Sequence, residues 1–153
     1  MSYDIHFLKR DPGQSWDDAM EALEEQANAA ETLGRPPNWD GVVSEVRALL
    51  GDVSVVEAPP TWEIDHRATA IQVSCYSGEW SISVPFWSDG DAAKKVAAHL
   101  RAISEIVQRA TGLAPYDPQL ESAVTSDEWT ADQAAAVFDR VAESFDLRGI
   151  VRG

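Results

Sequence analysis

Four polar side chains have the types and spacing that could support binding or chemistry: His6, Gln72, Ser81 and Ser83. His6 alternates with apolar neighbours near the N-terminus, and the other three alternate with apolar residues within 69–87. Because successive side chains of a strand point to opposite faces, this alternation predicts that all four share the polar face of one sheet. A small-molecule site needs such polar groups to converge beside apolar walls. An ordinary solvated sheet face has the same composition.

The other reactive side chains do not indicate a particular reaction. Cys75 is the only cysteine, and it falls on the predicted core face, where a free thiol behaves as a small hydrophobic group. His66 follows Asp65, a pair that only weakly suggests acid–base chemistry, and His99 is expected at a helix surface or rim. The metal spacings HxxxH, CxxC and HxxE are missing, as are the GxSxG, Walker and GxGxxG motifs. We therefore expect no metal and no cofactor, and we favour a non-catalytic protein while leaving an enzyme open.

A hairpin over 69–87 is the firmest structural element of the sequence. Its two runs alternate with period two, and Ser77-Gly78 lies between them as a tight turn. A two-residue loop pairs Tyr76 with Glu79 and, further out, Val73 with Ile82. Every apolar residue then meets an apolar partner, and a slip of one residue would destroy that match.

The remaining periodicities predict one α+β domain over residues 1–153. Period-two or short apolar runs predict strands at 3–8, 53–56, 62–65 and 113–116, of which the two between 52 and 67 are the least certain. Apolar stripes at helical spacing predict two helices before residue 51, a long helix after 90 and a last helix after Thr130. Ser15, Asn38 and Thr130 are the expected N-caps.

This order is close to the split βαβ arrangement of ferredoxin-like domains. We expect a mostly antiparallel sheet with the helices on one face, an extra helix in the first crossover and an added C-terminal helix.

The charge balance favours a basic partner. The net charge is −14, and before residue 60 there are 12 acidic against 4 basic side chains. Nucleic acid is a poor partner because no cluster of Lys and Arg is available to neutralise phosphates. A cationic protein surface fits better, since opposite fields steer association. The alternative is that the excess of acidic side chains serves only to keep the chain soluble.

Candidate contacts for such a partner come from the first helix and from two tryptophans. The acidic candidates are Asp17, Asp18, Glu21, Glu24 and Glu25. The six tryptophans are many for this length, and Trp62 and Trp87 lack an obvious buried partner. We expect these two to be exposed aromatic anchors or to be partly buried at a sheet edge.

Four short strings resemble a group of small, acidic, uncharacterised proteins of actinobacterial type. They are MSYDIHFL at the start, GQSW at 13–16, SVPFW at 83–87 and YDPQ at 116–119. Some proteins of this kind are suspected immunity proteins that neutralise a secreted toxin. The resemblance implies a protein-binding role, and it implies no catalytic residues.

The sequence therefore predicts a non-catalytic bacterial binding protein, immunity-like, that engages a basic protein through an acidic surface. The alternative is a small-molecule-binding or enzymatic domain that uses the polar sheet face. A homodimer through that face or through the run 53–56 is a further alternative. With no apolar stretch near about 18 residues and no signal-peptide pattern, we expect no membrane contact and a cytoplasmic location.

Overall fold

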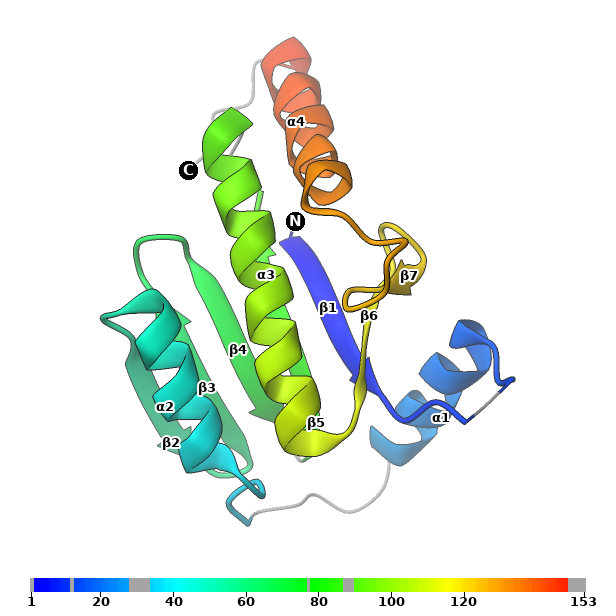
Figure 1. Ribbon diagram of the computed structural model, residues 1–153, viewed down its shortest axis with the longest axis vertical. Coiled ribbons are helices and arrows are strands. Elements are labelled where there is room, and N and C mark those ends of the chain that lie inside the picture. The colour runs from blue at the N-terminus through cyan, green and yellow to red at the C-terminus, as the bar shows by residue number, and fades with distance from the viewer. Residues whose placement is uncertain (1, 12, 28–33, 77, 87–89, 149–153) are drawn as a thin grey trace.

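A computed structural model describes residues 2–11, 13–27, 34–76, 78–86 and 90–148, with the backbone alone at 23–27 and 143–148. The fold is α+β: an open, antiparallel sheet of seven strands and four helices (Figure 1). The strands are β1 (Ser2–Leu8), β2 (Ser54–Ala58), β3 (Thr61–His66), β4 (Ile71–Tyr76), β5 (Glu79–Pro85), β6 (Ala114–Asp117) and β7 (Ser122–Ala123). The helices are α1 (Trp16–Ala27), α2 (Trp39–Leu50), α3 (Gly90–Thr111) and α4 (Ala131–Arg148).

The strand order is β2-β3-β4-β5-β1-β6-β7, and every pair of neighbours is antiparallel. The β4–β5 hairpin has the predicted register, from Tyr76 opposite Glu79 to Gln72 opposite Ser83. The uncertain region before it forms the β2–β3 hairpin, which turns through a cis peptide bond between Pro59 and Pro60. The expected ferredoxin-like pattern is not confirmed, because this hairpin and β7 make the sheet larger than that fold usually has.

The core lies between the sheet and the layer formed by α2, α3 and α4. Apolar side chains of the strands, such as Ile5, Val73 and Ile82, are buried against stripe residues of these helices. In Figure 1, α3 crosses in front of the sheet, α2 lies over the β2–β3 side and α4 packs beside α3. The amphipathic stripes explain this layer, because each helix has one apolar face to bury. None of the described helices is long and apolar enough to cross a bilayer.

The expectation that all helices share one face is wrong for α1. Trp16 and Met20 of this helix pack with Leu8 and Tyr116. Tyr116 is opposite His6 in the β1–β6 pair, so both point away from the core layer. Helix α1 therefore covers the β1–β6 end of the second face of the sheet. The amphipathic pattern of a helix does not determine which face of a sheet it packs on.

Two of the three predicted caps form. The backbone N–H of Asp18 donates to Ser15 Oγ at 3.1 Å, and that of Gln133 donates to Thr130 Oγ1 at 3.1 Å. Asn38 precedes α2 in the left-handed region with φ of 61° and makes no side-chain cap. Its Nδ2 donates instead to the carbonyl of Ala110 at 2.8 Å, which ties the start of α2 to the end of α3.

Candidate functional site

The face of the sheet that the helical layer leaves uncovered is the candidate site, and we call it the open face. The register of the strands arranges its side chains in two long adjacent rows across the sheet and a shorter third row, which runs Ala58, Thr61, Tyr76, Glu79. The first row runs Ser54, Asp65, Gln72, Ser83, Asp4, and the second runs Val56, Glu63, Ser74, Ser81, His6, Tyr116. Directly opposite residues on neighbouring strands have Cβ atoms about 4.5–5.5 Å apart, so each row is a continuous surface.

The four residues singled out by the sequence all lie on the open face. His6 is opposite Ser81, and Gln72 is opposite Ser83, in the two adjacent rows. All four side chains are half-buried, and the hydroxyl of Ser81 is 3.0 Å from that of Ser74. The predicted sharing of one face is confirmed, while any role in binding stays a prediction.

The open face is acidic. It carries the carboxylates of Asp4, Glu63, Asp65 and Glu79, and none of the seven strands contains Lys or Arg. Burial raises the pKa of Glu79, and the positive field of His6 opposes that rise. Glu63 and Asp65 belong to a strand that the sequence left uncertain. The sequence feature that indicates this strand is the alternation of Glu63 and Asp65 with Trp62 and Ile64, whose side chains are buried.

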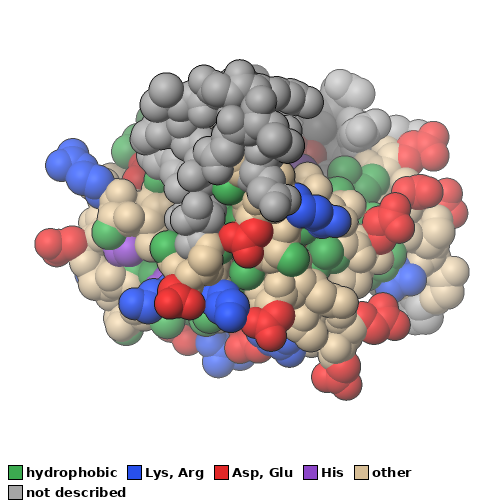
Figure 2. All heavy atoms as spheres, turned by 90° about the horizontal axis from the view of Figure 1, so that it is seen from above, with side chains coloured by type: hydrophobic (Ala, Val, Ile, Leu, Met, Phe, Trp, Pro, Cys, Tyr) green, Lys and Arg blue, Asp and Glu red, His purple; other side chains and the backbone are tan. Residues whose placement is uncertain are grey.

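The cations of the described secondary structure lie in the helices. Two of them pair with acids of the same layer: Arg101 with Glu105 at 3.5 Å, and Arg109 with Glu45 at 3.2 Å. On the end of the molecule seen in Figure 2, blue and red side chains are interspersed. The ion pairs of the described residues include none of the four open-face acids. Cations lie at the margins of this face, where Arg10 stacks on Trp16 and Arg67 lines the same cavity as Asp65. The strands of the face themselves carry an excess of acid.

Helix α1 places further acids next to the open face. The helix is anchored by Trp16, whose ring stacks on that of Tyr116 with the centroids 4.6 Å apart. The guanidinium carbon of Arg10 lies 4.1 Å from the centroid of the Trp16 ring. Asp17, Asp18 and Glu21 are exposed. The side chains of Glu24 and Glu25 lie outside the described residues.

Desolvation raises the pKa of Tyr116, and the nearby charges of Glu121, Asp17 and Asp117 raise it further. Asp17 therefore lies close enough to the end of the open face to act on it electrostatically.

Trp62 is not an exposed anchor. It is only 6% exposed, because it is opposite Cys75 on the core face of β3, and its ring lies 5.9 Å from that of Trp39 in an edge-to-face arrangement. Its Nε1 is buried without a hydrogen-bond partner. The sequence alone did not determine whether Trp62 is exposed or buried, because the strand around it is too short for its alternation to be decisive. Trp87, the second proposed anchor, lies outside the described residues.

Asp65, His66, His99 and Cys75, all among the described residues, lie in different environments. Asp65 and His66 are adjacent on β3 and point to opposite faces, and the Nδ1 of His66 is 2.7 Å from the hydroxyl of Thr69. Burial lowers the pKa of His99, and the charge of His66 lowers it further. Burial raises the pKa of Cys75 to about 11. No three His, Cys, Asp or Glu side chains of the described part of the chain are grouped to hold a metal ion.

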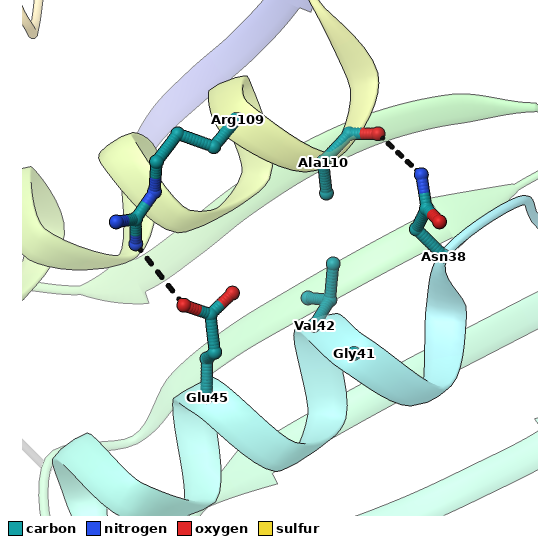
Figure 3. A pocket seen from close by; sticks show the side chains of 6 residues that line it. All are labelled: Asn38, Gly41, Val42, Glu45, Arg109 and Ala110. Carbon is teal, nitrogen blue, oxygen red and sulfur yellow. Dashed lines mark hydrogen bonds and ion pairs between the residues drawn. The ribbon is translucent and has the colours of Figure 1, made fainter.

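Two cavities are lined by none of the four ligand candidates, although the second borders Gln72 through Asp65, which is opposite it. One, of about 420 Å³, lies between α2 and α3 (Figure 3). Val42 forms part of its wall. The Asn38–Ala110 hydrogen bond and the Glu45–Arg109 ion pair cross this cavity. The polar groups that line it therefore already have partners. The other, of about 410 Å³, lies at the β3–β4 turn and is lined by Ser54, Asp65, His66, Arg67, Ala70 and Ile71.

No protein family model, curated protein sequence or solved structure matches this chain.

Proposed function

We propose that this chain is a non-catalytic binding protein, immunity-like and intracellular, that engages a basic protein partner. The binding surface consists of the open face together with the exposed acids of α1. The observation that carries the proposal is the charge of the open face, which has four carboxylates and no Lys or Arg. A field of one sign over a broad surface raises the association rate of an oppositely charged protein.

The shape of the surface favours a macromolecule over a small ligand. The two rows extend across five or six strands, and neighbouring strands are about 4.8 Å apart, so the surface is roughly 20 Å wide. The two cavities described above are lined by none of His6, Gln72, Ser81 and Ser83, the four side chains that the small-molecule or enzymatic alternative uses. The resemblance to suspected immunity proteins agrees with a protein partner.

We also propose that the centre of the sheet is a ferredoxin-like unit that has been extended at both edges. The support is the order β6-β1-β5-β4, antiparallel throughout, with α3 between β5 and β6. Such a unit packs its helices on one face and leaves the other available for binding.

A pair of charge-reversal variants tests the binding proposal. The first variant changes Asp4, Glu63 and Asp65 to Lys. The control changes Asp52, Asp127 and Glu128, three exposed acids of turns outside the sheet, to Lys. Each variant has three reversals of two charge units, so the net charge rises from −14 to −8 in both. Circular dichroism would first verify that both fold.

The purified wild type is used as bait in a lysate of the source cells at low and high salt. We expect a stoichiometric, salt-sensitive protein to be retained by the wild type and the control and lost by the open-face variant. With the captured protein in hand, the open-face variant should associate at least about tenfold more slowly. Equal association rates for both variants would show that overall charge, and not the open face, directs binding. Reversing Asp17, Asp18 and Glu21 in a separate variant measures the contribution of α1.

A further inference from the structure

The sheet ends in two unlike edges. β7 forms one of them and contains two residues, too few to template another strand. β2 forms the other, with five residues from Ser54 to Ala58, and among the described residues it pairs with β3 alone. An edge strand of this length presents a row of backbone N–H and C=O groups to any extended segment that approaches it.

β2 has one of the features that protect edge strands, the charge of Glu57, which faces the core side and pairs with Arg35 at 3.2 Å, but it lacks others. No Lys or Pro occurs between Ser54 and Ala58, although both residues commonly block edge-to-edge pairing. The side chain of Val56, at the centre of the strand, is 43% exposed and is one of three large hydrophobic side chains found exposed among the described residues. Its neighbours on the same face, Ser54 and Ala58, are small. A free edge with an exposed β-branched centre is well suited to accept one more strand.

The rows of the open face indicate which chemistry that strand would have. Ser54 is followed across the sheet by Asp65, and Val56 by Glu63. A strand added beyond β2 would lie about 4.8 Å from it and roughly 10 Å from β3. Lys and Arg side chains are long enough to pass over the small Ser54 and approach Asp65, and the aliphatic stem of a second one would cover Val56 while its charge approaches Glu63.

A second copy of this chain fits the edge less well. Two copies of net charge −14 repel each other, and no strand carries a Lys or Arg to offset that repulsion. Antiparallel self-pairing centred on Val56 would also place Glu57 of one copy opposite Val55 of the other, and the cation next to Glu57, Arg35, is already paired with it at 3.2 Å.

We propose that the edge of β2 accepts an extended cationic segment of the partner as an eighth strand, with alternate Lys or Arg side chains over the open face. This inference rests on the proposed acidic interface and adds the mode of docking. Main-chain hydrogen bonds along β2 supply the pairing, and Asp65 and Glu63 select the charge of the incoming strand.

Two capped peptides of equal charge test the docking mode. The first alternates Lys and Val over seven residues, beginning and ending with Lys, and the second has Pro in place of the central Val. Proline removes a backbone donor and disfavours a central strand position, so it weakens strand pairing and leaves the charge unchanged. Amide hydrogen exchange of the full chain at low salt is followed by NMR with each peptide.

We expect the alternating peptide to slow exchange of outward-facing amides within Ser54–Ala58 by at least about tenfold, and the proline peptide to leave them unchanged. Val56→Lys should abolish the protection, because it places a competing cation beside Glu63 and an edge-blocking residue in the strand. Val56→Thr, which retains a β-branched side chain, should preserve it.

Other outcomes separate this inference from the proposed function. If both peptides bind equally and the Asp4, Glu63 and Asp65 reversal abolishes both, edge docking is overturned and the acidic interface stands. If neither peptide binds and the wild type nevertheless captures a basic protein through the open face, edge docking is overturned alone. A dimer in light scattering that Val56→Lys dissociates would assign the edge to a second copy and overturn the cationic segment.

Discussion

A buried carboxylate, Asp117, allows the sharpest test of how the sheet is held together. Its side chain is fully buried at the end of β6. Oδ2 accepts hydrogen bonds from the hydroxyl of Tyr3 and from Nε1 of Trp129, the latter at 2.7 Å. Oδ1 accepts from the backbone N–H of Gln119 at 2.8 Å and from that of Leu120 at 3.4 Å. One carboxylate thus joins β1, β6 and the segment that leads to α4.

The substitution Asp117→Asn keeps the size of this side chain and removes half of its acceptors. All four partners donate, whereas an amide has one oxygen and one NH₂ group. With the amide nitrogen in the Oδ2 position, Trp129 loses its acceptor, while the Tyr3 hydroxyl can turn and accept from the amide; with it in the Oδ1 position, the part-buried N–H groups of Gln119 and Leu120 lose theirs. An unsatisfied donor costs about 1–3 kcal/mol, and each remaining hydrogen bond loses about 1 kcal/mol with the charge of its acceptor, so we expect a loss of roughly 2–6 kcal/mol in the free energy of unfolding. This is a large part of the about 5–15 kcal/mol that is usual for a domain.

Urea denaturation followed by tryptophan fluorescence measures the loss. Tyr3→Phe is the matched comparison, because it removes one donor and leaves the carboxylate with three. One hydrogen bond to a charged group contributes about 1.5–3 kcal/mol, so Tyr3→Phe should cost less than Asp117→Asn. The double variant should cost less than the sum of the two, since the partners are coupled.

The reasoning would be refuted by an Asp117→Asn variant that is as stable as the wild type or more stable than Tyr3→Phe. Either result would mean that, in the protein in solution, the Asp117 carboxylate does not receive these four hydrogen bonds. The pKa of Tyr3 gives a second measurement. Burial raises it most, and the charge and hydrogen bond of Asp117 raise it further, so Asp117→Asn should lower the pH at which Tyr3 ionises.

Two further predictions concern the buried titratable groups. Since burial raises the pKa of Cys75 to about 11, only about one thiol in a thousand is ionised at pH 8. Ellman's reagent should therefore label the native protein slowly and the urea-unfolded protein at once; fast native labelling would contradict the buried position. The pKa of His99 is lowered below its ordinary value of 6.5, so the unfolded chain binds this proton more readily, and stability should fall as the pH drops below about 6.5. His99→Gln should flatten that slope in denaturation curves between pH 7 and 5, and an unchanged slope would exclude His99 as its source.

Local patterns were sufficient where the deciding interactions are close in sequence. The register of β4 and β5 was predicted residue by residue, because a one-residue slip would move every apolar side chain to the wrong face. The caps of Ser15 and Thr130 were predictable for a similar reason, since each contacts a backbone N–H three residues ahead. The content of the open face follows from the same alternation.

Long-range contacts determined the features of the fold that local patterns did not predict. Asn38 has the right type for a cap, yet its amide bonds to Ala110, which is 72 residues away. Trp62 is buried because β3 pairs with β4 in a register that faces its ring toward Trp39. β7 is too short to have a pattern of its own. Each of these depends on which elements become neighbours, and that is not encoded in any local window.

In the candidate site, too, some features follow from the local sequence and others only from the tertiary structure. By itself, the sequence determined that His6, Gln72, Ser81 and Ser83 would share a polar face and that the chain is strongly acidic. Only the tertiary structure placed Glu63 and Asp65 in the same rows, put β2 at the edge and set α1 on the β1–β6 end of that face. Side-chain direction within a strand follows from the alternating backbone, which is local. The order of the strands and the position of the helices follow from burying all apolar faces together, which is a property of the whole chain.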